Sequence, residues 1–261
     1  AIADASARTG RRIHMHLLET KPQRQWIDQA YPQGGVVFLD KIGFLSPRLT
    51  LAHCVWARDR ELDKIATSGA RIVVNNSSNL HLYSGCAPVA DMQAAGVAVA
   101  MGLDGTTLDE DDDGLRELRL FHLLGRRPGY SANEGINHKA ALQAACSTGR
   151  AALGLPDGGV LEVGMPADLL ILDLEGLDRD ALMPVPVEDL LFARATAAHV
   201  VEVWASGRQV VREGHVLSCD LDAAETSLRA AYRAALPATA PLRAAWPQIE
   251  RAIATHYRGC C

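Results

Sequence analysis

Polar residues follow several apolar runs of this chain, and their types suit metal binding and proton transfer. They are His16, Glu19, His53 and Asp104, which lie at or just after the ends of the runs 11–18, 49–53 and 97–103. Polar side chains at the carboxyl ends of successive apolar strands are how a parallel α/β barrel builds a site. Imidazole and carboxylate groups supply both metal ligands and proton carriers. The pattern therefore indicates a metal-dependent hydrolase.

Strands alternate with helices over residues 11–125. The main predicted strands are 11–19, 49–56, 71–74 and 97–101, with a further strand-like run at 36–39 that leads into a short helix to about residue 42. The predicted helices between and after them include 58–68, 89–95 and 114–124. This alternation predicts parallel βα units, and the nearly continuous apolar character of the strands fits burial on both faces. We count four such units, half of an eight-fold barrel.

The second half of the chain has a different pattern. A predicted helix at 137–152 is followed by short strands at 159–163, 167–172, 200–204 and 209–211, and then by amphipathic helices at 221–236 and about 241–257. The short strands predict a small antiparallel β domain. We therefore predict a barrel portion at 1–157, a small β domain at 158–217 and C-terminal helices at 218–261.

Bulk composition excludes several classes of protein. The net charge of −5 gives no electrostatic basis for binding nucleic acid or anionic lipid. No apolar run approaches the roughly 20 residues of a membrane-spanning helix. The six cysteines include no Cys-x-x-Cys pair, which disfavours a disulfide framework or a zinc ribbon and suits a reducing cytoplasm. We expect a cytoplasmic protein with a small-molecule substrate.

Several motifs together resemble the amidohydrolase superfamily, in particular its cytosine/guanine-deaminase-like and triazine-hydrolase (chlorohydrolase) branch. They are HMHLLET at 14–20, LAHC at 51–54, SSNLHLYSGCAPV at 77–89, GLDGTT at 102–107, AACSTGRAALGL at 144–155 and GGVLEVGMPADLLILD at 158–173. The resemblance implies the C-terminal portion of such an enzyme. The implied fold is α/β, the second half of a metal-dependent (β/α)8 barrel with a small β-sandwich domain and C-terminal helices.

The resemblance also implies roles for individual residues. His16 matches a metal-binding histidine, and Asp104 matches the aspartate that binds the metal and takes a proton from its water. Glu19 matches the carboxylate that shuttles protons to the substrate, and His53 the histidine that hydrogen-bonds the attacking water or the substrate. Asn79 matches an asparagine that is more structural than chemical. The implied cofactor is one divalent ion, zinc first and iron second.

The implied reaction is hydrolytic deamination of a purine, pyrimidine, pterin or triazine by metal-bound hydroxide. Alternatives are hydrolysis of a ring amide or of a halide or alkylamino substituent, and a non-catalytic fragment. Side chains that could contact the substrate are Trp56, His81, Tyr83 and Asp109. Trp56 could equally pack, and the acidic run 109–113 suits the N-terminus of the helix 114–124. His53 could cap a strand, and Asp104–Gly105 could be a turn.

One family feature has no counterpart in this sequence. The family has a His-x-His pair on its first barrel strand, and no such strand precedes residue 11. His14 and His16 would share one face of a strand, but too few strand-end ligands follow for a first strand. We therefore expect the N-terminal half of the barrel to be missing, and the open sheet edges predict that these 261 residues are not a stable monomer. Analogy with the family suggests a homo-oligomer.

Overall fold

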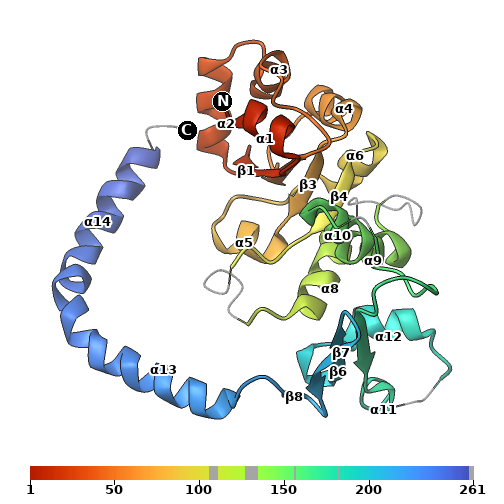
Figure 1. Cartoon of the computed structure of the whole chain (residues 1–261). Helices are drawn as coiled ribbons and strands as arrows, with labels where there is room; N and C mark the ends of the chain where they lie inside the picture. Colours follow the sequence, from red (N-terminus) through yellow and green to blue (C-terminus); the bar gives the residue numbers. More distant parts are fainter. Residues whose placement is uncertain (106–110, 127–134, 156, 181–182, 259–261) are drawn as a thin grey trace.

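Two four-stranded sheets organise the protein. The structure is a computed structural model that describes residues 1–105, 111–126, 135–155, 157–180 and 183–258. One sheet has the strand order β1-β2-β3-β4 and the other the order β5-β6-β7-β8 (Figure 1). The chain is therefore mixed α/β, as the alternation of strands and helices predicts.

The first sheet is wholly parallel and carries the predicted site residues at its carboxyl edge. Its strands are β1 (Ile13–Leu17), β2 (Leu49–His53), β3 (Arg71–Val74) and β4 (Ala98–Met101). All five residues of β2 are buried, as expected for a central strand with both faces covered. The predicted strand at 71–74 is thus confirmed with its bounds, and those at 11–19, 49–56 and 97–101 are confirmed with shorter bounds.

Helices follow the strands and complete the first core. They are α1 (Ile2–Thr9), α2 (Lys21–Ala30), α3 (Gly35–Lys41), α4 (Asp59–Ser68), α5 (Asn76–His81), α6 (Val89–Ala94) and α8 (Gly114–Leu124). The strand predicted at 36–39 is wrong, because this run lies inside α3. Val36 is buried, Leu39 is partly buried, and Phe38 and Asp40 are exposed, which is helical spacing. A four-residue apolar run does not distinguish helix from strand.

The helix predicted at 137–152 is two helices, α9 (His138–Ala145) and α10 (Ser147–Leu153). Cys146 separates them with backbone angles φ −102° and ψ −90°, which are not helical. Ser147 and Thr148 follow directly and favour a helix start over a helix interior. Gly154 then ends α10 in the left-handed conformation, where glycine has no Cβ penalty.

The second sheet is antiparallel, as predicted for the small β region. Its strands are β5 (Leu169–Leu172), β6 (Val200–Ala205), β7 (Arg208–Arg212) and β8 (His215–Val216), with α11 (Leu174–Leu177), α12 (Val187–Arg194) and the 3-10 turn η1 (Ala197–His199) between β5 and β6. The strand predicted at 159–163 is wrong. This segment is irregular, and its apolar side chains Leu161 and Val163 are almost fully exposed. Apolar residues do not form a strand where no neighbouring strand pairs with them.

The C-terminal helices arch away from both sheets in Figure 1. They are α13 (Leu221–Ala235), the 3-10 turn η2 (Leu236–Thr239) and α14 (Ala240–Arg258), close to the predicted bounds. Their large apolar side chains, including Leu228, Tyr232 and Trp246, are exposed. Among the described residues, no helix combines the length and apolar character that crossing a bilayer requires.

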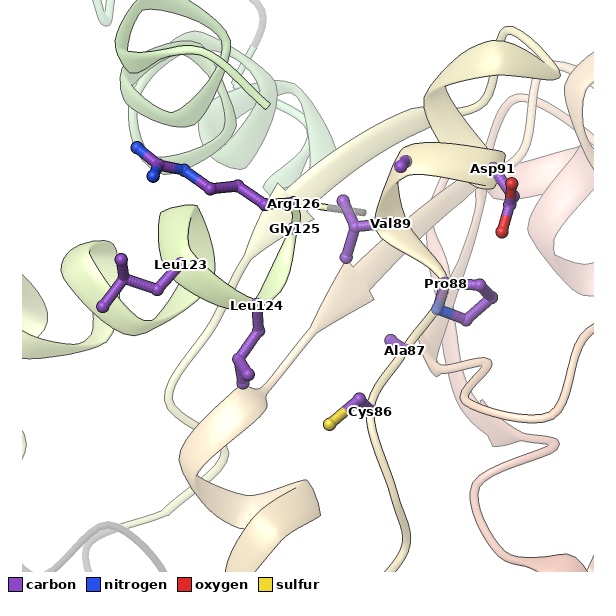
Figure 2. Close-up of a pocket in the computed structure, with 10 residues that line it drawn as sticks. Cys86, Ala87, Pro88, Val89, Asp91, Leu123, Leu124, Gly125 and Arg126 are labelled. Atoms are coloured by element: carbon purple, nitrogen blue, oxygen red, sulfur yellow. The ribbon is translucent and has the colours of Figure 1, made fainter. Parts of the chain in front are cut away.

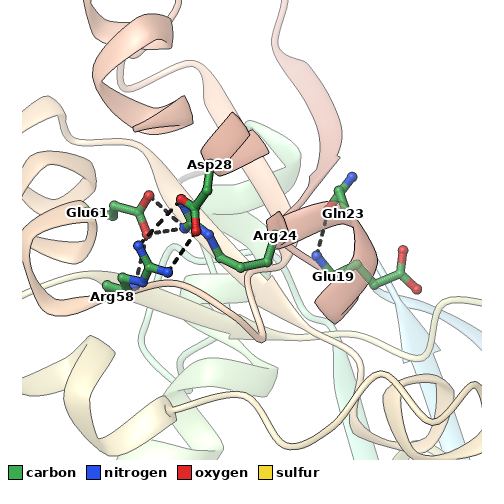
Figure 3. A network of polar contacts seen from close by, with 6 residues as sticks. All are labelled: Glu19, Gln23, Arg24, Asp28, Arg58 and Glu61. Atoms are coloured by element: carbon green, nitrogen blue, oxygen red, sulfur yellow. Dashed lines mark hydrogen bonds and ion pairs between the residues drawn. The ribbon is translucent and has the colours of Figure 1, made fainter. Parts of the chain in front are cut away.

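A buried ion pair joins the helices that follow β1 and β2. Arg24 of α2 donates from Nη1 to both carboxylate oxygens of Glu61 of α4, at 2.8 and 2.7 Å (Figure 3). Arg24 and Glu61 are 4% and 1% exposed, so both charges are withdrawn from water. Asp28 pairs with Arg24 and Arg58, and the Arg58 backbone N–H donates to Glu61. The network fixes α2 against α4, and with them the segments that leave the two strands.

Candidate active site

The carboxyl edge of the parallel sheet brings the four predicted residues together. The register pairs Leu17 of β1 with His53 of β2, so Glu19 emerges beside His53. Leu18, His53 and Asp104 have positive φ angles of 54°, 72° and 73°, which few residues other than glycine adopt. Such backbone strain persists only where the surrounding structure enforces it, and it is common at functional sites. Three strands therefore end in strained turns that aim polar side chains into one region.

His53 lies at the centre of this region and is fully buried. Its Nε2 atom is 4.0 Å from Oε2 of Glu19 and 3.9 Å from Oδ2 of Asp104. Its Nδ1 atom is 2.8 Å from Oδ1 of Asn79, a carbonyl oxygen that can only accept, so Nδ1 carries the hydrogen. Nε2 of the neutral ring is then an acceptor, and among the described residues it has no hydrogen-bond partner. Three acceptor atoms thus converge, an arrangement that suits a cation or a proton donor.

The carboxylates on either side of His53 are also oriented. Ser78 Oγ donates a 2.6 Å hydrogen bond to Oδ2 of Asp104. The backbone N–H of Glu19 donates to Oε1 of Gln23, at 2.8 Å, while its side chain lies 3.5 Å from Ser84 Oγ (Figure 3). Both carboxylates are partly exposed, at 21% for Glu19 and 25% for Asp104. They can therefore exchange protons with a ligand or with solvent.

His14 and His16 lie on one face of β1, as strand alternation requires. The ring of His16 stacks on His53 with centroids 5.2 Å apart, and His14 meets His16 edge-on at 6.2 Å. Burial, and next the neighbouring rings of His16 and His53, lower the pKa of His14. Within the part of the chain that the structure describes, no three His, Cys, Asp or Glu side chains are grouped closely enough to hold a metal by themselves. The metal-ligand roles of His16 and Asp104 therefore stay predictions from the resemblance.

The four side chains predicted to contact a substrate have different environments. Trp56 follows β2, is 36% exposed, and its Nε1–H donates to the Ser84 carbonyl at 2.8 Å. His81, at the end of α5, is exposed, and Tyr83 is 95% exposed with a positive φ of 57°. Asp109 lies outside the described residues. The Trp56 ring is thus held in place next to the turn that contacts Glu19.

Three site residues were not predicted from the sequence. Ser78 and Ser84 contact the two carboxylates, and Glu117 of α8 binds the backbone of α5. Glu117 has a sequence signal, because it shares the buried face of its helix with Leu118 and Phe121 at helical spacing. A charged residue on an apolar helix face has to be paired, so this position could have been singled out.

Neither Cys54 nor the nearby cavity supplies the chemistry of the candidate site. Burial raises the pKa of the Cys54 thiol, the residue after His53, far above neutrality, so this cysteine stays protonated and inert. A cavity of about 500 Å³ lies between the segment Cys86–Asp91 and the end of α8 (Figure 2). Its lining is mainly apolar and includes none of the four strand-end side chains. The candidate site is therefore the polar edge of the parallel sheet.

Comparison with protein-family models decides the family. The model described as amidohydrolase family matches residues 1–211. The chain belongs to the amidohydrolase family. The resemblance noted from the strand-end motifs is thereby confirmed.

Several curated relatives of this amidohydrolase chain are named as deaminases. It is 32% identical over 219 residues to a 5'-deoxyadenosine deaminase of Methanosarcina barkeri, a match covering 84% of this chain and 50% of the relative. It is 35% identical over 210 residues to a 5-methylthioadenosine/S-adenosylhomocysteine deaminase of Halobacterium salinarum, covering 80% and 47%. The chain spans about half the length of the curated relatives it matches.

Solved structures show the same partial overlap. An adenosine deaminase from Xanthomonas campestris with bound zinc is similar at a TM-score of 0.79 and 29% identity, over 87% of this chain and 51% of that one. An atrazine chlorohydrolase from Arthrobacter aurescens complexed with zinc is similar at 0.77 and 28%, over 87% and 50%. The amidohydrolase fold and its relation to triazine hydrolases are thus both supported.

Proposed function

We propose that this chain carries the proton-transfer residues of a zinc-dependent deaminase that acts on amino-substituted nitrogen heterocycles. One observation supports this above all: the buried Nε2 of His53 faces the carboxylates of Glu19 and Asp104 at 4.0 and 3.9 Å. The Asn79 contact fixes the hydrogen of this ring on Nδ1, so Nε2 can accept a hydrogen bond. An acceptor imidazole between two carboxylates is suited to moving the protons of a water molecule.

The architecture belongs to the same proposal. β1 to β4 are strands five to eight of a (β/α)8 barrel, and β5 to β8 belong to a small β-sandwich domain, with boundaries near residues 157 and 217. In the proposed barrel, strands one to four are not among these residues. The coverage of the relatives supports this, because the chain matches 50% of the length of one deaminase and 51% of a similar solved chain.

His16 and Asp104 are the residues of this chain that would hold the metal. The donor set fits zinc, because imidazole nitrogen and carboxylate oxygen are both common zinc ligands. When bound, the ion supplies Lewis acidity that activates water at neutral pH. Zinc is present in the similar adenosine deaminase and atrazine chlorohydrolase structures.

Three residues of this chain have separate tasks in the proposed reaction. Asp104, held by Ser78, accepts a proton from the attacking water. His53 accepts a hydrogen bond from the same water through Nε2 and so fixes the direction of attack. Glu19 carries protons to the ring nitrogen and to the departing amine, because an amine leaves readily only when protonated. Its partial exposure lets it exchange protons between turnovers.

We propose an adenine nucleoside as the substrate class to test first, because the curated relatives are named for such compounds. The exposed Trp56 face, with Tyr83 and His81 on the neighbouring segment, would contact the planar base. Aromatic side chains stack on planar rings without requiring a specific pattern of hydrogen bonds.

The test is ammonia release by the zinc-loaded protein that contains this chain. Adenosine, 5'-deoxyadenosine and 5'-methylthioadenosine are the substrates, and Glu19→Gln should lower kcat by about 100- to 10,000-fold. Glu188→Gln, which changes an exposed carboxylate of α12, is the matched control and should have no effect. The proposal fails if the zinc-loaded protein releases no ammonia from any amino heterocycle, or if Glu19→Gln is as active as Glu188→Gln.

The similarity to the atrazine chlorohydrolase favours a second candidate reaction, hydrolysis of a halide or alkylamino substituent on a triazine. Both reactions attack a ring carbon with water, and they differ in the leaving group. A halide leaves without being protonated, so Glu19→Gln should impair chloride release less than ammonia release. Release of chloride or alkylamine from a chlorotriazine, compared with release of ammonia from adenosine, distinguishes the two functions.

A further inference from the structure

Two neighbouring residues of one short helix orient two of the four strand-end side chains. Ser78 donates to Asp104 at 2.6 Å, and Asn79 accepts from His53 at 2.8 Å. Both belong to α5, and both are fully buried. The position of α5 therefore sets the rotamer of Asp104 and the tautomer of His53 together.

α5 is too short to hold itself in place. It has six residues, whereas isolated helices shorter than about 12 residues are marginal in water. Its N-cap residue, Asn75, makes no side-chain capping hydrogen bond within the described structure. The first amides of α5 need another acceptor, because Asn76 is buried and Ser77 is partly buried.

Glu117 of α8 supplies that acceptor. Its Oε1 accepts from the backbone N–H of Asn76 at 2.7 Å and from that of Ser77 at 3.3 Å. Glu117 is 3% exposed, and α8 lies beside α5 (Figure 1). A buried carboxylate at a helix N-terminus makes strong charge-assisted hydrogen bonds and interacts favourably with the helix dipole.

We propose that Glu117 is a positioning residue of the active site, which acts through α5 on both His53 and Asp104. It contacts neither side chain directly, and the connection runs through backbone amides. The importance of Glu117 for catalysis rests on the proposed function. The structural connection itself can be tested without turnover.

The experiment is NMR of the protein that contains this chain, labelled with 15N. Long-range proton–nitrogen spectra report which ring nitrogen of His53 carries hydrogen, and backbone spectra report Ser78 and Asn79. In the wild type these spectra should place the hydrogen on Nδ1, which faces the carbonyl oxygen of Asn79. Glu117→Ala should shift the two amide resonances and convert His53 to a mixture of tautomers, and zinc affinity should fall by about tenfold, the low end for residues that orient metal ligands.

Two further variants keep the proposal falsifiable if Glu117→Ala does not fold. Glu117→Gln retains an acceptor oxygen and should keep the wild-type tautomer, whereas Glu117→Asp is one methylene short and should lose it. Asp220→Ala is the control, because it removes a carboxylate that caps α13 away from the site, and it should leave the His53 signals unchanged. The inference is overturned if Glu117→Asp and Glu117→Ala, or the one of them that folds, retain the wild-type tautomer and the amide shifts of α5. That result would not affect the proposed deaminase reaction, which ammonia release tests separately.

Discussion

Replacing Arg24 by methionine should destabilise the protein by about 3–5 kcal/mol, the cost of leaving a buried charge without its partner. Arg24 makes two bonds to Glu61, at 2.8 and 2.7 Å. Hydrogen bonds to charged groups contribute about 1.5–3 kcal/mol each, which gives a similar total. Within the part of the chain that the structure describes, Glu61 would retain one donor, the backbone N–H of Arg58 at 3.0 Å. Asp28 loses little, because it keeps its ion pair with Arg58.

Urea unfolding of matched variants measures this effect. Lys64→Met removes the exposed pair with Asp40, whose side chains are 40% and 50% exposed, and should cost less than about 1 kcal/mol. The double variant Arg24→Met/Glu61→Leu leaves no unpaired buried charge, so it should be more stable than Arg24→Met alone. The reasoning is refuted if Arg24→Met costs no more than Lys64→Met.

Three other predictions follow from single positions. A methyl group on Gly102 would overlap the side chain of Asn75, so Gly102→Ala should lower the melting temperature, whereas Gly105→Ala, with open space around it, should not. Burial, and then the charge of Arg126, lower the pKa of His122 to about 4. Below pH ~6.5 His122 is therefore protonated in the unfolded chain but not in the folded one. The free energy of unfolding decreases as the pH drops from ~6.5 toward ~4, by about 2 kcal/mol at pH 5. Urea unfolding at a series of pH values should show a smaller decrease for His122→Gln. Ser78→Ala should weaken zinc binding about tenfold by calorimetry, whereas Ser77→Ala, whose buried hydroxyl has no described partner, should not.

The parallel sheet and the meeting of His16, Glu19, His53 and Asp104 could be predicted from sequence. Each residue ends or follows a run of apolar residues, and parallel strands bring their carboxyl ends to one edge whatever the details of packing. The run 36–39 was assigned wrongly because four apolar residues satisfy both a strand and a buried helical turn. The fold adds a contact that the run itself does not show, because Gly35 at the start of α3 packs so closely on Ile27 of α2 that no room remains for a Cβ.

The contacts that orient the site could not be predicted. Ser78 and Asn79 lie 26 residues from Asp104 and His53, respectively, and only the folded geometry of α5 brings them into contact. The Ser-Ser-Asn sequence after β3 indicates a turn or a helix start, but it does not identify which side chains it meets. Glu117, 41 residues beyond Asn76, depends in the same way on how α8 packs.

The left-handed backbone at His53 and Asp104 has a consequence for protein engineering. Each such residue costs of the order of 1–3 kcal/mol relative to one that adopts the conformation freely, and glycine adopts it at no steric cost. A library selected for thermal stability alone would therefore be enriched in glycine or asparagine at position 104, which is partly exposed. Selection for turnover would restore aspartate there, and both selections would keep histidine at the fully buried position 53, where glycine would leave a cavity. The residues whose enrichment reverses between the two selections would outline the catalytic centre without any knowledge of the substrate.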